Sequence, residues 1–414
     1  MTARALEGVR VVEICDELGA YCGKLLADLG ADVIKVEPPG GGIQRLSPPF
    51  YGGEATPDTS VAFWAHNTSK RSIVLDLETE AGRASAKALA LSADIVIEEN
   101  PVGFLAARGL GYKELSAAKP SLVYTSITGF GQTGPHAGWA YTDIVGQATG
   151  GILTLAGEAA DPPNIIYGNQ ASISASIHAA QGTMVALLHA EATGEGQWVD
   201  VSAQEAVSMS QETAMMTWDF QKRNRTRTGA LGMLPVQLPG SGVYMAADGW
   251  VSLFVVAPGG AGFPGLLEWM QEAGMAEELD REPLASLCAE MNMATLTRLM
   301  SDPAKIQDAV ASLVEINGVV SRFIASMTKT QVYEEGQARR LLVGIVSTPK
   351  DLAENSQLRA REWYHNVALP GLGAEVEFMG PPYRLSETPT VIGRPPMLGE
   401  HTDEMLSALA GGTK

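Results

Sequence analysis

The stretch from residue 9 to residue 37 most constrains how this chain can fold. Residues 9–15 (VRVVEIC) form a β-rich apolar run, and residues 20–30 (AYCGKLLADLG) have helically spaced leucines and a final glycine. Residues 32–37 (DVIKVE) follow at once as a second apolar run. Strand, helix and strand in this order form the repeating unit of a parallel sheet with right-handed crossovers. The N-terminal stretch therefore predicts a parallel α/β sheet.

The same alternation continues through the first third of the chain. Further strands are predicted at residues 72–77 (SIVLDL), 94–99 (DIVIEE) and 121–128 (SLVYTSIT). The helices between them are predicted at about residues 79–91 and around residues 109–115 (GLGYKEL). This repetition predicts the α/β fold class, with a large doubly wound, Rossmann-like domain.

A different pattern begins near residue 228. Residues 243–256 (VYMAADGWVSLFVV) are two apolar runs around Asp248-Gly249, a hairpin signal, and several helical segments follow them. We expect the N-terminal part of the large domain over residues 1–222 and a small α+β domain over residues 223–335. Residues 336–414 are expected to form a linker and a tail that returns to the large domain.

The charge of the chain limits its partners. The formal net charge is −18 over 414 residues, which argues against nucleic acid and anionic membranes as partners. An anionic ligand would need a local basic pocket to overcome this field. The three cysteines are not clustered like metal ligands and are expected to be reduced thiols. With no leader-like or membrane-length apolar run, we expect a cytoplasmic protein.

Common cofactor and catalytic motifs are missing from the sequence. It contains no G-x-G-x-x-G turn, no Walker sequence and no G-x-S-x-G elbow, and its six histidines lack the spacing of metal ligands. The basic segment 66–72 (HNTSKRS) before a predicted strand can hold an anion at the sheet edge. A solvated turn is the competing interpretation.

Several segments, in order, resemble class III CoA-transferases, the family of formyl-CoA and carnitine CoA-transferases and α-methylacyl-CoA racemases. The resemblance rests on LEGVRVVEI, GKLLADLGADVIKVEPPGGG, NTSKRSIVLDL, GLGYKEL, SLVYTSITGFGQTGP, TGEGQWVDVS, DGWVSL, RLSETP and PPMLGEHTDEML. It implies an interlocked dimer with CoA at the interface. It also implies an Asp nucleophile that attacks the acyl-CoA thioester, forming an acyl-aspartyl anhydride and then an aspartyl-CoA thioester.

The chain departs from this family at the nucleophile. The resemblance implies an Asp six positions before the H-A-A-x-G that begins at His178, and that position is Ser172. No Asp or Glu occurs between Pro162 and Ala190. A serine hydroxyl needs a base to become nucleophilic, and its ester would not remain an activated acyl carrier. The histidine of the racemases is replaced by Thr142. With the Asp also missing, the chain lacks both acid-base groups for proton transfer at an α-carbon.

The CoA site that the resemblance implies is partly altered as well. Pro38 stands where Arg is common, and residues 98–103 (EENPVG) lose an Arg and add a negative charge. The remaining candidates for CoA binding are Asn67, Lys70, Arg71 and Asn100. We expect CoA to bind this chain weakly or not at all, as a substrate of a complex rather than a tightly held cofactor.

Three functions remain open. The first is a non-catalytic subunit paired with a homologous, Asp-bearing subunit, as in heteromeric members such as succinyl-CoA:benzylsuccinate CoA-transferase of anaerobic toluene degradation. The second is a homodimeric CoA-thioester lyase, isomerase or hydrolase with altered chemistry. The third is a homodimeric transferase with an unusual nucleophile. In the first case CoA would pass between an acyl-CoA such as succinyl-CoA and an organic acid, with benzylsuccinate as a candidate.

Overall fold

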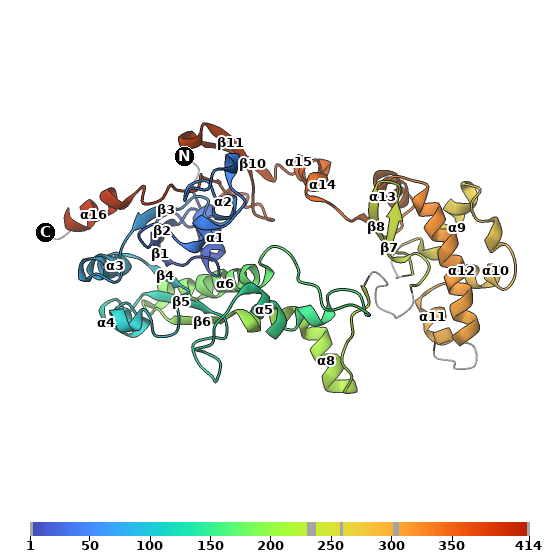
Figure 1. Cartoon of the computed structure of the whole chain (residues 1–414), viewed down its shortest axis with the longest axis horizontal. Helices are drawn as coiled ribbons and strands as arrows, with labels where there is room; N and C mark the ends of the chain where they lie inside the picture. The colour runs from blue at the N-terminus through green and yellow to red at the C-terminus, as the bar shows by residue number, and fades with distance from the viewer. Residues whose placement is uncertain (1–2, 230–236, 257–259, 301–305, 412–414) are drawn as a thin grey trace. The chain divides into compact units, whose positions relative to one another are not determined.

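The computed structural model describes residues 3–229, 237–256, 260–300 and 306–411, which form two compact units (Figure 1). Unit 1 consists of Met1–Thr154, Ile165–Arg225 and Gln357–Lys414. Unit 2 consists of Leu155–Asn164 and Thr226–Ser356.

The boundaries of unit 2 differ from those expected for the small domain. Its end lies at Ser356 rather than at residue 335, because strand β9 (Val343–Ile345) pairs with a strand of this unit. It also takes in Leu155–Asn164, where the Arg227 side chain donates hydrogen bonds to the backbone carbonyls of Glu158 and Asp161. Both additions come from long-range pairing that local sequence patterns do not report.

Unit 1 is built on a six-stranded, fully parallel sheet in the order β3-β2-β1-β4-β5-β6. Its strands are β1 (Arg10–Ile14), β2 (Asp32–Glu37), β3 (Arg71–Val74), β4 (Ile95–Glu98), β5 (Val123–Thr128) and β6 (Trp198–Ser202). This arrangement confirms the predicted α/β fold with a doubly wound, Rossmann-like sheet. The strand order reverses between β1 and β4.

Helices cover both faces of this sheet because the strands are apolar on both sides. The helices of unit 1 are α1 (Ala20–Asp28), α2 (Val61–His66), α3 (Glu80–Ser92), α4 (Tyr112–Ala118), α5 (Asp143–Thr149), α6 (Gln170–Thr193), α7 (Ala203–Ser208), α8 (Glu212–Gln221) and α16 (Thr402–Gly411). Val11 belongs to the core that α1, α6 and α7 share, whereas its neighbour Val12 belongs to the core of α3, α4 and α16. The side chains of β1 thus alternate between two cores.

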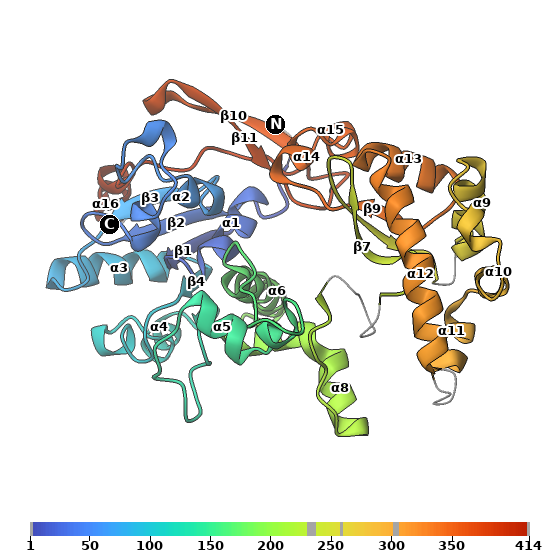
Figure 2. The ribbon, with the colours of Figure 1, turned by 45° about the vertical axis from the view of Figure 1, so that its right-hand side comes forward.

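The tail of the chain packs on unit 1. Strands β10 (Tyr364–Leu369) and β11 (Ala374–Met379) form an antiparallel hairpin (Figure 2). Its apolar side chains pack with Phe63 and Trp64 of α2. The His401 backbone N–H donates to the Ser72 carbonyl at 2.9 Å. These contacts hold the described part of the tail, residues 357–411, to the sheet that carries the candidate site.

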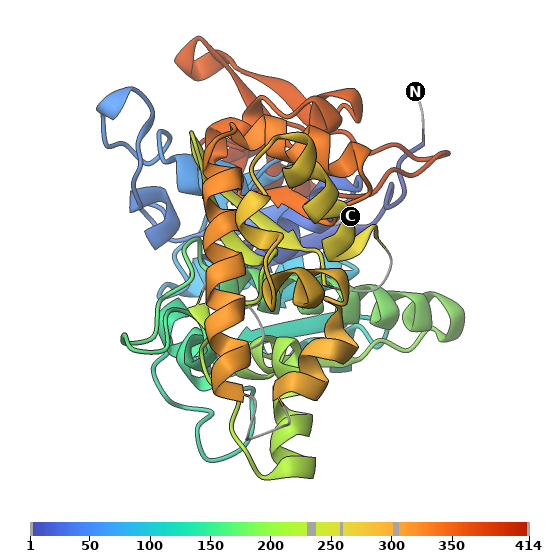
Figure 3. The same cartoon turned by 90° about the vertical axis from the view of Figure 1, so that its right-hand side faces the viewer.

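Unit 2 contains a three-stranded antiparallel sheet of β7 (Ser241–Ala246), β8 (Gly249–Phe254) and β9. The predicted hairpin at Asp248-Gly249 is confirmed. The helices are α9 (Gly262–Glu272), α10 (Leu284–Ala289), α11 (Met293–Met300), α12 (Ile306–Ala325), α13 (Lys329–Ala338) and α14 (Pro349–Ala353), while α15 (Ser356–Ala360) crosses the unit boundary. Helix α12 is the long orange helix of Figure 3, and it supplies Leu313, Ile316 and Val320 to the core of unit 2.

Among the described residues, no single helix has the length and apolarity needed to cross a membrane. The bent pair formed by residues 309–325 and 329–338 meets that test only by length and composition.

Candidate functional site

A cavity of about 290 Å³ lies where the strand order of the sheet reverses. Parallel α/β sheets bind ligands at this point, because the connections after the two neighbouring strands leave in opposite directions and open a crevice. The cavity is lined by Glu17 and Leu18, which follow β1, and by Glu99 and Asn100, which follow β4. Ser172 lines it from the first turn of α6.

The position of Ser172 is fixed by a carboxylate at the start of its helix. Asp143 Oδ1 accepts hydrogen bonds from the backbone N–H groups of Ala171 (2.9 Å) and Ser172 (3.0 Å). Asp143 Oδ2 accepts a hydrogen bond from Gln147 Nε2 at 2.6 Å. This carboxylate satisfies orphan donors of α6 and faces the positive end of its dipole. Ser172 is 6% exposed, so its side chain is held at the wall of the cavity.

Acidic side chains dominate the charge of this cavity. Glu17, Glu99 and Asp143 line it, and its lining contains no Lys, Arg or His among the described residues. The Gly19 backbone N–H donates to Glu99 Oε2 at 2.6 Å. Burial raises the pKa of Glu99 to about 7, and the nearby Asp16 carboxylate adds to this effect. Burial, with Asp16 and Asp143, also raises the pKa of Glu17.

Two hydroxyl groups that line the cavity have no hydrogen-bond partner in the described residues. They are Thr128 Oγ1 and the Tyr141 hydroxyl, and both atoms are buried. Trp139 also lines the cavity, is 61% exposed, and stacks on His136 with ring centroids 3.8 Å apart. An unpaired buried hydroxyl is costly, so these groups are available to a bound molecule or ordered water.

Two of the residues predicted to bind CoA, Lys70 and Asn67, form hydrogen bonds with other residues of unit 1. Lys70 is 4% exposed, and its Nζ donates to Glu13, to the Ala20 carbonyl at 2.7 Å and to Asn67 Oδ1 at 2.8 Å. Burial lowers its pKa to about 8. The Asn67 amide nitrogen donates to Gln44 Oε1 at 2.7 Å and to the Phe63 carbonyl at 2.8 Å. These side chains stabilise the loop before β3, and neither lines the Ser172 cavity.

The other two predicted residues differ in their placement. Arg71 forms a bidentate ion pair with Asp32 and a second contact, at 3.2 Å, with Glu404 of α16, and it does not line the cavity. Asn100 does line it, with its side-chain amide donating to the Ile14 carbonyl at 3.2 Å. The structure therefore brings only Asn100 of these four residues together with Ser172.

Sequence reasoning did not place the glutamates Glu17 and Glu99 beside Ser172. Each comes shortly after a strand, β1 or β4, but these strands are about 80 residues apart in the sequence. Only the strand order shows that β1 and β4 are neighbours at the point of reversal. Within the described ranges, no group of three or more His, Cys, Asp or Glu side chains is arranged to hold a metal ion.

Replacing Glu99 with Gln is expected to stabilise unit 1 at pH 8 by roughly 1–3 kcal/mol. The pKa of Glu99 is about 7 in the folded protein, against an ordinary value of 4.5. Between pH 4.5 and pH 7 the folded protein therefore holds a proton on Glu99 that the unfolded chain has lost. Its contribution to stability therefore falls as pH rises from about 4.5 to 7. Urea unfolding at pH 5 and pH 8 measures this. The exposed Glu114→Gln variant is the control. The same change in unfolding free energy between pH 5 and pH 8 in the parent, Glu99→Gln and Glu114→Gln proteins would contradict the expectation.

Comparisons with known proteins agree on one family. Residues 6–402 match the model of CoA-transferase family III. Succinyl-CoA:(R)-benzylsuccinate CoA-transferase subunit BbsE of Thauera aromatica is 34% identical, over 96% of this chain and 92% of that protein. Succinyl-CoA–D-citramalate CoA-transferase of Chloroflexus aurantiacus is 33% identical, over 99% and 95%. A CaiB/BaiF family crystal structure from Brucella suis superposes with a TM-score of 0.80 at 28% identity, covering 98% and 99%.

Proposed function

The chain belongs to CoA-transferase family III, and we propose that it is the supporting, non-catalytic subunit of a heteromeric CoA-transferase. A homologous subunit with Asp at the position of Ser172 supplies the nucleophile. The complex moves CoA between an acyl-CoA such as succinyl-CoA and an organic acid, in the cytoplasm.

The observation that carries this proposal is the environment of Ser172. Ser172 lies in the cavity at the reversal of strand order, where the family resemblance implies an ionised Asp. A serine hydroxyl does not attack a thioester unless a base removes its proton. No histidine or lysine lines this cavity in the described parts of the chain. Asp143 is already hydrogen-bonded to the helix start and to Gln147.

The charge of the cavity also supports the proposal that catalysis takes place in the partner subunit. CoA and succinyl-CoA are anions, and the described cavity presents the carboxyl groups of Glu17, Glu99 and Asp143 without a cation, with Glu99 ionised above its pKa of about 7. Like charges within a few ångströms repel by about 1–4 kcal/mol at effective dielectrics of 80 to 20. Lys70 and Asn67, expected to bind CoA, are occupied by internal contacts. Weak CoA binding by this subunit follows from both features.

Exposed apolar surface on two helices supports a protein partner. Helix α6 exposes Ile177, Val185 and Leu188 by 47%, 62% and 62%. Helix α8 exposes Met215, Met216, Trp218 and Phe220, the last by 81%. Solvent-facing aromatic and aliphatic side chains in such number mark interaction surfaces. A homologous chain with the same fold can cover these helices in a paired assembly.

The substrates are proposed from the relatives. The proteins of Thauera aromatica and Chloroflexus aurantiacus are both named for succinyl-CoA, and the first is named as a subunit acting on (R)-benzylsuccinate. We therefore take succinyl-CoA as the donor of the complex. Benzylsuccinate is the candidate acceptor, which would place the complex in the degradation of aromatic compounds.

One observation favours a second function, a homodimeric CoA-thioester lyase, isomerase or hydrolase. Glu99 shares the cavity with Ser172 and has a pKa raised to about 7 by burial, in the range of a general acid or base at neutral pH. In this case the chain alone would turn over a CoA thioester, and activity would depend on Glu99 or Ser172.

Native mass spectrometry of the protein purified from its own source tests the proposal. We expect an assembly with a homologous chain of similar size that carries Asp at the position of Ser172. We also expect no CoA transfer by this chain alone and transfer by the assembly. A homodimer without other chains would overturn the proposal, and thioester turnover by that homodimer would establish the second function.

A further inference from the structure

A second cavity in unit 1, of about 770 Å³, is formed entirely by the tail of the chain. Its lining residues lie between Leu358 and Thr390, at the start of β10 and in the segments before and after the β10–β11 hairpin. It shares no lining residue with the Ser172 cavity. No residue that the sequence indicated as functional contributes to it.

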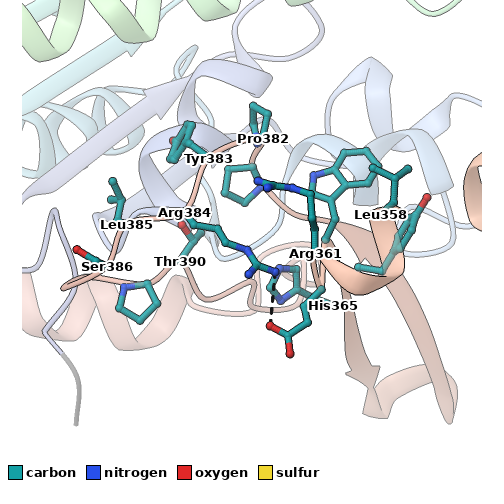
Figure 4. A pocket seen from close by; sticks show the side chains of 14 residues that line it. Leu358, Arg361, His365, Pro382, Tyr383, Arg384, Leu385, Ser386 and Thr390 are labelled. Atoms are coloured by element: carbon teal, nitrogen blue, oxygen red, sulfur yellow. Dashed lines mark ion pairs between the residues drawn. The ribbon is translucent and has the colours of Figure 1, made fainter. Parts of the chain in front are cut away.

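This tail cavity has the basic character that the Ser172 cavity lacks. Arg361, Arg384 and His365 line it together with one acid, Glu362. Figure 4 shows Arg384 extending along the cavity, and the dashed line marks its ion pair with Glu362. Two arginines against one carboxylate leave a positive lining in a chain whose formal charge is −18. An anion attracted to this molecule would find a favourable local field here.

The pairing of Arg384 within the chain is weak. Its Nη2 lies 3.5 Å from Glu362 Oε2, beyond the usual hydrogen-bond distance, and the two side chains are 55% and 86% exposed. Exposed ion pairs of this kind contribute little to stability. A ligand carboxylate that accepts two parallel N–H bonds from the guanidinium group would be a better partner than Glu362.

The remaining walls are aromatic and proline-rich. Trp363, Tyr383, Pro381, Pro382 and Pro389 line the cavity. Trp363 Nε1 is buried and has no hydrogen-bond partner in the described residues, and the same is true of Thr390 Oγ1. The indole nitrogen is a donor only, so the group that would satisfy it is an acceptor such as a carboxylate oxygen. Flat rings pack well against such walls.

We propose that the tail cavity binds an organic acid that carries an aromatic ring. Arg384 and Arg361 hold the carboxylate, and the Trp363, Tyr383 and proline walls hold the ring. This binding site does not depend on the proposed function, because it uses none of the residues of the Ser172 cavity and no partner chain.

The charge balance favours a carboxylic acid over a nucleoside bisphosphate. Two arginines and one glutamate give the lining a formal charge of +1 with His365 neutral, which suits one or two carboxylates. Two phosphate groups would each bring a charge of about −1.5 to −2 at pH 7. The lining would leave most of that charge uncompensated.

Calorimetric titration of the full-length chain with phenylsuccinate tests the proposal. We expect saturable binding that weakens at high salt, and binding of the ringless succinate at least about tenfold weaker. The Arg384→Gln and Arg361→Gln variants should each weaken phenylsuccinate binding by about tenfold or more. Glu362→Gln should strengthen it, since the competing carboxylate is removed.

Arg108→Gln is the matched control. Arg108 is another arginine of unit 1 in an ion pair, with Glu78 at 2.6 Å, and it lies outside the tail cavity. Its variant should bind phenylsuccinate like the parent chain. Absence of phenylsuccinate binding, equal binding by Arg384→Gln and the parent, or tighter binding of adenosine 3′,5′-bisphosphate would each overturn the proposal.

Discussion

Replacing Glu13 with alanine is expected to lower the free energy of unfolding of unit 1 by about 3–5 kcal/mol, because it leaves two buried ammonium groups without their shared carboxylate. Glu13 is fully buried on β1. Its carboxylate contacts Lys35 Nζ at 2.9 Å and Lys70 Nζ at 2.8 Å, and both lysines are also buried. Removing one partner of such a cluster costs far more than the cluster contributes when intact.

Urea and thermal unfolding measure this effect. A loss of this size corresponds to a fall in melting temperature of roughly 10 °C for a unit of this length. Glu78→Ala is the control, since Glu78 pairs with Arg108 while 70% exposed, and its loss should cost less than about 1 kcal/mol. A Glu13 variant as stable as the Glu78 variant would show that the lysines find other partners or lose their protons at little cost.

The strands and helices of unit 1 could be predicted from the sequence because each is encoded by the pattern of apolar residues within its own segment. In β2, Asp32–Glu37, the apolar run and the observed strand coincide, and the helical stretch predicted over residues 20–30 contains the observed helix, Ala20–Asp28. Strand order, by contrast, depends on which strands pair across long separations. Only the structure shows β4 beside β1, and this pairing creates the cavity around Ser172.

The roles of charged residues were harder to predict. The segment 66–72 is basic in sequence, and an anionic ligand was one interpretation of it. In the structure the carboxylate that faces Lys70 comes from Glu13, 57 residues earlier. Glu13 lies in an otherwise apolar strand, and its burial is a property of the folded sheet. A buried ion pair therefore occupies the side chain that was expected to bind CoA.

No local sequence pattern predicted the tail cavity, although Arg384 belongs to RLSETP, one of the segments that carry the family resemblance. Arg361 and Arg384 are separated by a hairpin in the sequence. The fold of β10 and β11 brings these segments together. Net charge alone would have argued against any anion site, because a sum over the chain does not describe the local field of one cavity.

Introducing a carboxylate with Ser172→Asp is expected to give no measurable CoA transfer on its own, whereas the double variant Ser172→Asp/Glu99→Gln should gain it. In the mechanism that the family resemblance implies, the carboxylate attacks the thioester carbonyl and releases CoA thiolate. The thiolate then attacks the resulting anhydride and releases the free acid. The first step needs an ionised carboxylate and an anionic acyl-CoA in the same cavity.

The carboxylates already present oppose both requirements. Glu17, Glu99 and Asp143 would raise the pKa of an introduced carboxylate and repel succinyl-CoA. Above the Glu99 pKa of about 7, removing the charge of this side chain relieves one of these three interactions, of the order of 1–4 kcal/mol, or about 5- to 900-fold in rate. Asp143 must remain, because it caps α6 through the backbone N–H groups of Ala171 and Ser172.

Intact-protein mass spectrometry after incubation with succinyl-CoA follows the covalent CoA adduct directly. Glu99→Gln alone is the control without a nucleophile, and it should form no adduct. If Ser172→Asp forms the adduct as fast as the double variant, the charge of Glu99 does not limit the rate of attack on the thioester. A folded double variant that forms no adduct would show that this subunit lacks the binding contacts for an acyl-CoA as well as the nucleophile. In that case, restoring catalysis would require the partner subunit and not a single substitution in this chain.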